Sequence, residues 1–319
     1  MHLLQPSLAQ AHAGLRAMKV VATTDGPMPP AVEALLEAAE GHVLRLEHPL
    51  DLAALAPISP AELAAAIVEA DLRQQLVHGL ILVSLADGKP SAKKGDAVVA
   101  FATALGVSTA EVHSVERLAH HHMLLFRADF MRRSHIAESF KHQVEASGLW
   151  GTIKAVLGMR GLLEDRELAA RYRALGDLAP DTLGYQFIEY LDRNGFSAPG
   201  EKHGFPEAGI WHDFTHVLSG YDTDPAGEMQ IGAFIAGYKQ HNPFYVLMFV
   251  MLTFGTGVNM TPLPQAHSEG ILAEPGLAEK VFAALERGSK VTMDLTDHWN
   301  HWDYVERPVD EVRQLLHIE

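Results

Sequence analysis

Apolar residues recur along most of the chain at the three- and four-residue spacing of an α-helix, and alternating β-branched runs are scarce. One clear stripe passes through Leu72, Leu76, Leu80 and Val83. It ends at residues 86–90, where an Asp-Gly pair and a proline form a helix stop. This pattern predicts an all-α fold made of two helical domains, or two helical halves packed together.

Capping residues indicate where several helices begin. Serine, threonine and aspartate side chains accept hydrogen bonds from the first free N–H groups of a helix, and proline suits the first helical position. These signals predict helix starts after Ser59, after Ser91, at Ser108 or Thr109, and after Asp224, and a helix over about 207–219 between Pro206 and Gly220.

The segment 243–254 is apolar on every side and contains the longest strongly apolar run of the chain. It is too short to cross a bilayer, which needs about 20 such residues, so we expect no transmembrane span. A helix that is apolar all round is most often a buried helix. The alternative is that its Met and Phe side chains line a tunnel for a hydrophobic or prenylated substrate.

Composition narrows the classes of function. The 319 residues include 25 Lys and Arg against 40 Asp and Glu, and the resulting formal charge of −15 argues against broad nucleic-acid binding. The chain has no cysteine, so any metal must be held by ligands such as His, Asp, Glu or Asn. Residues 1–19 lack the basic and apolar regions of a secretory signal, so we expect a cytoplasmic protein, with peripheral membrane contact as an alternative.

We place the domain boundary between residues 148 and 149, within the segment 147–163. This segment has no strong Pro/Gly/Ser linker, so a continuous helix can join the two halves. In the first half, residues 85–89 and 101–108 resemble the TerB-like helical domain of tellurite-resistance proteins, over about 65–133.

Two features of this first half argue against a metal site there. The TerB-like domains usually carry acidic residues after the Asp-Gly turn, but Lys93 and Lys94 stand there in this chain. The triplet His120-His121-His122 would point in three directions, because successive helical residues are about 100° apart. We therefore expect these histidines to be surface residues.

The strongest chemical pattern is His212-Asp213-x-x-His216, followed after eleven residues by Glu228. Two histidines four apart share one helix face, and two imidazoles with one or two carboxylates can hold a divalent cation. The alternative to a metal site is a solvent-exposed polar face of the helix, because these residues lie opposite its apolar arc. Glu228 favours the metal, since it shares a face with Ile231 and Ile235, where an acid must be protonated, paired or bound to a metal.

This pattern resembles the hallmark of the ubiquinone (coenzyme Q) biosynthesis family known as Coq-four. The flanks agree: residues 182–196 are similar to the segment before that family's motif, residues 227–228 match its Gly-Glu pair, and residues 299–316 resemble its C-terminal helix. The likeness covers about 163–319, which gives a TerB-like domain at 1–148 and a Coq-four-like metal-binding domain at 149–319.

The resemblance implies a mostly helical protein that acts in coenzyme Q assembly on a ring with a long isoprenoid tail. It gives His212, Asp213, His216 and Glu228 as metal and catalytic residues, with zinc as the usual ion. Iron, manganese and cobalt stay open, and Asp213 can be a fourth ligand, an orienting residue or a general base. The family has been viewed both as a scaffold for biosynthetic enzymes and as an enzyme of oxidative decarboxylation.

Three hypotheses of function follow. The first is a metal-dependent decarboxylase or oxidative decarboxylase that acts on a carboxylated aromatic or quinone precursor, or on a related natural product. The second is a non-catalytic protein that binds lipid or biosynthetic partner proteins, with a structural metal. The third is a zinc hydrolase, because His-Asp-x-x-His has the histidine spacing of the His-Glu-x-x-His motif. A homodimer is compatible with each.

Overall fold

The computed structural model describes residues 3–319 except 47, 259, 261–267, 269 and 298. The predicted all-α fold is confirmed: the described residues form helices and no strand, and an isolated bridge joins Thr182 to Pro308. Up to the middle of the chain the helices are α1 (Leu8–Ala22), α2 (Pro30–Ala39), η1 (Glu40–Leu44), α3 (Pro60–Ala66), α4 (Ala70–Leu85), α5 (Ala92–Ala104), α6 (Ala110–Ala119), α7 (Met123–Arg133) and α8 (His135–Met159).

The remaining helices belong to the C-terminal half. None of the helices in the described part of the chain has the length and apolar character needed to cross a membrane. In order they are α9 (Arg166–Arg173), η2 (Ala174–Asp177), α10 (Leu183–Asn194), η3 (Glu207–Gly209), α11 (Trp211–Ser219), α12 (Pro225–Tyr238), α13 (Pro243–Val250), η4 (Met251–Gly255), η5 (Ile271–Ala273), α14 (Leu277–Ser289), η6 (His301–Asp303) and α15 (Val309–Leu316).

The capping signals are confirmed where they were expected. Ser59 forms a capping box with Glu62, the Ser91 hydroxyl accepts from the backbone N–H of Lys94, and Thr109 occupies the N-cap position of α6. The helix expected over 207–219 has a 3₁₀ turn at its start and becomes α-helical only from Trp211. The apolar run 243–254 is helical and buried, and its last turn widens into a π-helix.

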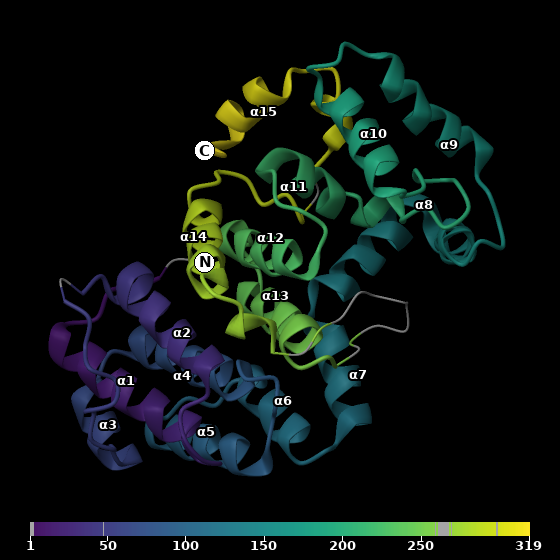
Figure 1. Ribbon diagram of the computed structural model, residues 1–319. Coiled ribbons are helices and arrows are strands. Elements are labelled where there is room, and N and C mark those ends of the chain that lie inside the picture. The colour runs from purple at the N-terminus through teal and green to yellow at the C-terminus, as the bar shows by residue number, and fades with distance from the viewer. Residues whose placement is uncertain (1–2, 47, 259, 261–267, 269, 298) are drawn as a thin grey trace.

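Helices from both sides of residue 148 share one hydrophobic core. Figure 1 shows the purple and blue helices α1–α6 on one side, α12, α13 and α14 in the middle, and α9, α10 and α15 on the other side. Helix α2 packs against α14, and α4 packs against η4. Helix α8 crosses the expected boundary, and its backbone kinks at Gly148, which has a φ of 67°. Shared burial thus couples the two halves, while their division into domains stays a prediction.

The Asp-Gly turn between α4 and α5 contacts a buried lysine. The Lys94 side chain is buried, and its ammonium lies 2.5 Å from Asp87 Oδ2 and 3.2 Å from the Lys89 carbonyl oxygen. A buried charge needs such partners. The turn also lies against the C-terminal half, since a Cβ at Gly88 would come 2.4 Å from the Gly255 carbonyl oxygen.

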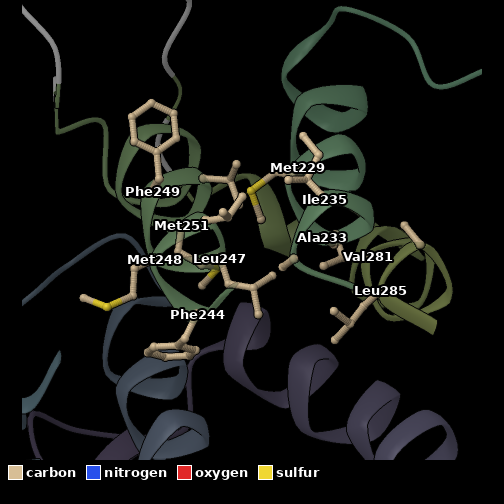
Figure 2. Close-up of a cluster of buried hydrophobic side chains, with 14 of the residues drawn as sticks. Met229, Ala233, Ile235, Phe244, Leu247, Met248, Phe249, Met251, Val281 and Leu285 are labelled. Atoms are coloured by element: carbon tan, nitrogen blue, oxygen red, sulfur yellow. The ribbon is translucent and has the colours of Figure 1, made fainter. Parts of the chain in front are cut away.

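Helix α12 lies at the centre of the C-terminal half because its small residues allow close approach. A Cβ at Gly237 would lie 2.6 Å from the Leu285 carbonyl oxygen, and a Cβ at Gly288 would lie 2.0 Å from that of Phe234. The α12 and α14 backbones therefore touch. Figure 2 shows side chains of α12, α13 and α14 that point into the space between these helices, including Met229, Ala233 and Leu247. This packing fixes the helix that carries Glu228.

Candidate metal site

Helices α11 and α12 form a tight helical hairpin. Gly220 ends α11 in the left-handed region, with a φ of 79°, and its N–H donates to the His216 carbonyl oxygen at 2.8 Å. Four residues later, the Asp224 carboxylate accepts from the Gly227 N–H at 2.7 Å and starts α12. The connection is therefore short enough to bring the first turn of α12 against the histidine face of α11.

The hairpin brings together three of the four expected site residues. His212 Nε2 lies 3.5 Å from Glu228 Oε2, and His216 Nε2 lies 3.4 Å from Glu228 Oε1. One ligand atom from each residue can be chosen so that all three lie within 4.8 Å of one another. The solvated-face alternative is wrong for His216, whose side chain is 1% exposed, because α12 and Tyr190 of α10 cover that face.

The Tyr221 carbonyl orients His216. The Nδ1 atom of His216 lies 3.0 Å from this oxygen, so Nδ1 carries the proton and donates it. The buried Nε2 atom has no hydrogen bond within the described residues, and it faces the Glu228 carboxylate. A lone pair that faces a carboxylate is unfavourable unless a cation or a hydrogen-bond donor lies between them. A bound metal ion would satisfy both atoms, as would a proton between them or a bridging water.

The charges at the site reinforce one another. Burial alone would lower the pKa of His212, but the Asp213 and Glu228 carboxylates outweigh it and raise that pKa to about 10. Burial alone would raise the pKa of Glu228, but the two histidines outweigh it and lower that pKa to about 2. Without a metal, the site therefore holds an imidazolium and a carboxylate. Protons and metal ions compete for the same atoms.

Asp213 lies on the far edge of the His212 ring. Its Oδ1 atom is 3.3 Å from His212 Nδ1, and the described group that could hold one ion consists of His212, His216 and Glu228. A carboxylate at Nδ1 fixes the ring and makes the other nitrogen a better ligand. Of the roles that sequence left open for Asp213, this position favours orientation; a direct metal contact stays a prediction.

Two tyrosines that the sequence analysis did not single out also belong to the site. The ring of Tyr190 stacks on His216, with 5.6 Å between ring centroids. Burial raises the pKa of Tyr190, and the nearby Asp213 and Glu228 charges add to it, so its hydroxyl keeps its proton. A cavity of about 250 Å³ lies beside the site, and its lining includes Tyr190, Tyr221, His216 and Arg193. Spacing within the metal motif gave no signal for either tyrosine.

The ligand atoms are near one another but more widely spaced than in a zinc site. Two atoms that bind one zinc ion at about 2.1 Å each lie about 3.4 Å apart when the geometry is tetrahedral. The histidine–glutamate distances of 3.4 Å and 3.5 Å involve different Glu228 oxygens, and one atom from each of the three residues fits only within 4.8 Å, so binding one ion would draw the side chains closer together. The three histidines of the His120 triplet are exposed, as expected, but they are not helical: they form the turn between α6 and α7, where His121 has a φ of 59°, and His120 pairs with Asp96 at 2.9 Å.

A buried network supports α11 from behind. The His301 ring stacks on Phe214 of α11, with 4.9 Å between centroids, and its Nε2 atom lies 2.7 Å from the Tyr172 hydroxyl. That hydroxyl donates to the Glu207 carboxylate at 3.0 Å. The apolar side of α11 therefore packs against a hydrogen-bonded group that consists of His301, Tyr172 and Glu207.

We expect His301 to make the protein less stable in mild acid. Burial, together with the positive charge of Arg171, lowers the pKa of His301 to about 4, whereas an unfolded histidine titrates near 6.5. Between these values the unfolded chain binds a proton that the folded chain does not, so stability falls as pH falls from about 6.5 towards 4. The loss should be about 2 kcal/mol at pH 5.

Thermal unfolding of wild type and His301→Gln between pH 7 and pH 5 measures this effect. The amide of glutamine can keep a hydrogen bond to Tyr172 but does not titrate, so the variant should show a flatter dependence of Tm on pH. Equal slopes for the two proteins would contradict the assignment.

No family model matches the chain, and no curated protein matches it. The two resemblances therefore depend on the residues quoted for them.

Proposed function

We propose that the protein is an enzyme that uses one divalent metal ion to act on a small aromatic carboxylate. The ion is held by His212, His216 and Glu228. The observation that carries the proposal is the buried Nε2 atom of His216, which faces Glu228 and has no hydrogen bond in the described structure. Two imidazoles and one carboxylate suit zinc first, and iron, manganese and cobalt use the same donors.

The cavity beside the site supports the proposed class of substrate. Its volume of about 250 Å³ is below the usual range for drug-sized ligands, so it suits a single ring and leaves a prenyl tail outside. The lining carries both signs of charge: Arg193 and Arg313 can pair with an anionic group, and Glu189 and Asp222 are acidic.

Decarboxylation is the reaction that we assign to these groups. A bound cation supplies positive charge that holds the substrate oxygens and stabilises the charge left on the ring. The bond between the ring and the carboxyl carbon breaks, carbon dioxide leaves, and the ring carbon takes a proton. Asp213 keeps His212 oriented, and the Tyr190 hydroxyl keeps a proton close to the site. Replacement of the carboxyl group by hydroxyl would in addition need dioxygen and a redox-active metal such as iron.

Elemental analysis of the purified protein, combined with carbon dioxide release from a panel of hydroxybenzoates with and without a prenyl chain, tests the proposal. We expect about one equivalent of metal per chain and release that stops on chelation and returns when the metal is restored. A protein that binds no metal even after reconstitution would overturn it.

One observation favours a second function, the non-catalytic binding of lipid or partner proteins. Helices α7 and α8 expose large apolar side chains, among them Leu124 at 84%, Trp150 at 68% and Leu149 at 67% exposure. Leu149 and Trp150 are adjacent in α8, and neighbouring exposed apolar side chains often mark interaction sites. Under this alternative, removal of the metal lowers Tm while every candidate substrate stays intact. The hydrolase hypothesis has no comparable support, because Asp213 lies at His212 Nδ1.

A further inference from the structure

A second, larger cavity lies between the N-terminal helices and the centre of the protein. Its volume is about 600 Å³, within the usual range of small-molecule sites. Its walls come from α1, α4, α13 and α14, and it shares no lining residue with the cavity beside the metal site. Figure 2 shows Phe244 at the end of α13 that faces the purple and blue helices, with Leu247 and Leu285 nearby; all three line this cavity.

His78 is the unusual polar residue of this cavity. It lies on α4, and its ring stacks face to face on Phe244, with 3.9 Å between centroids and 7° between planes. Its Nε2 atom is buried and has no hydrogen-bond partner in the described structure. Buried polar atoms normally have a partner, and one without a partner weakens the fold. Burial also lowers the pKa of His78, so the ring is neutral at physiological pH.

The rest of the lining restricts the charge of a ligand. The lining includes the acidic residues Asp71 and Glu111, and it includes no lysine or arginine. A carboxylate or phosphate would therefore be repelled and would find no opposite charge. A neutral hydroxyl suits a neutral imidazole, because it can donate to Nε2 or accept from it.

The N-terminal segment closes one wall of the cavity. Leu3, Leu4 and Pro6 line it, and Gln75 of α4 holds this segment in place. The Leu4 N–H donates to Gln75 Oε1 at 2.6 Å, and Gln75 Nε2 donates to the Leu4 carbonyl oxygen at 2.8 Å. These paired bonds keep the apolar side chains of the segment along the cavity. Among the polar lining residues, His78 is the one with a buried nitrogen that has no partner in the described structure.

We propose that this cavity binds a neutral, single-chain amphiphile, whose hydroxyl group forms a hydrogen bond with His78 Nε2 and whose apolar chain lies between α1, α4 and α13. The site is separate from the metal site, so it goes beyond the proposed enzymatic function. It gives the N-terminal half a ligand of its own.

Decanol and decanoate are the probes that test this site, because they share a chain and differ in the head group. Binding is followed by NMR of proteins with ¹³C-labelled methionine methyl groups, since Met18 lines the cavity and Met18→Leu assigns its signal. We expect decanol to shift the Met18 signal and to bind at least tenfold more tightly than decanoate.

Two variants separate binding from folding. His78→Phe keeps a flat ring on Phe244 and removes the unpaired nitrogen, so we expect about tenfold weaker decanol binding with an equal or higher Tm. Leu82→Trp fills the cavity from α4 and should remove binding. Leu315→Trp, at a position on α15 that is 50% exposed and outside the cavity lining, is the matched control and should bind decanol as wild type does.

Several results would overturn the proposal: no shift of Met18 at saturating decanol, equal affinity for decanoate, wild-type affinity in His78→Phe, or wild-type affinity in Leu82→Trp. Metal content is measured in the same samples. It should be unchanged in every variant, so the outcome at this cavity is independent of the outcome at the metal site.

Discussion

Replacing His216 with alanine should lower the affinity for zinc by more than the roughly 100-fold that loss of an outer-shell partner can cost, and it should abolish turnover. His216 is the most buried of the three proposed ligands, and the Tyr221 carbonyl already fixes its ring with Nε2 directed towards Glu228. Water cannot easily replace an imidazole in a position that is 1% exposed. The remaining His212 and Glu228 would then hold the ion with two protein ligands, which is too few for a stable zinc site.

The experiment compares wild type, His216→Ala and His120→Ala by competition against a zinc chelator of known affinity. His120 is the matched control, because it is an exposed histidine that pairs with Asp96 on the surface. Circular dichroism confirms that each variant is folded. A folded His216→Ala protein with wild-type affinity and activity would remove the basis of the proposed function.

The sequence predicted the elements of this site better than it predicted their surroundings. The Asp224-Pro225 cap and the Gly220 stop are local signals, and they located the hairpin that brings Glu228 to the histidines. The burial of His216 could not be predicted in the same way. Helical periodicity shows which residues share a face, but it does not show that Tyr190, 26 positions earlier, covers that face.

Contacts between distant segments account for the other features that the sequence did not predict. The apolar run 243–254 was expected to be buried, and it is, but the stacking of His78 on Phe244 joins residues on opposite sides of the expected domain boundary. The stripe that begins at Leu72 identified α4 as a helix, yet gave no indication that a histidine on it would line a cavity. A local sequence pattern cannot predict contacts such as the stacking of His78 on Phe244, because the two residues are far apart in the chain.

Replacing Gly227 with alanine should weaken metal binding by about 10–100-fold, although residue 227 is not a proposed ligand. A Cβ at this position would lie 2.0 Å from the Asp222 carbonyl oxygen, which belongs to the backbone and cannot rotate away. The loop must therefore move, and it carries the Tyr221 carbonyl that orients His216. The same clash pushes on the first turn of α12, next to Glu228. We expect a loss of stability of about 1–3 kcal/mol as well.

Gly41→Ala is the matched control for this prediction, because a Cβ at Gly41 would meet no atom within 4 Å. The two variants and wild type are compared by zinc competition and by thermal unfolding with and without metal. If the hairpin geometry sets the affinity, Gly227→Ala gains less stability from zinc than wild type does, and Gly41→Ala gains as much. Equal stabilisation of all three proteins would show that the Tyr221 carbonyl does not control the site, and the orienting role assigned to it would have to be abandoned.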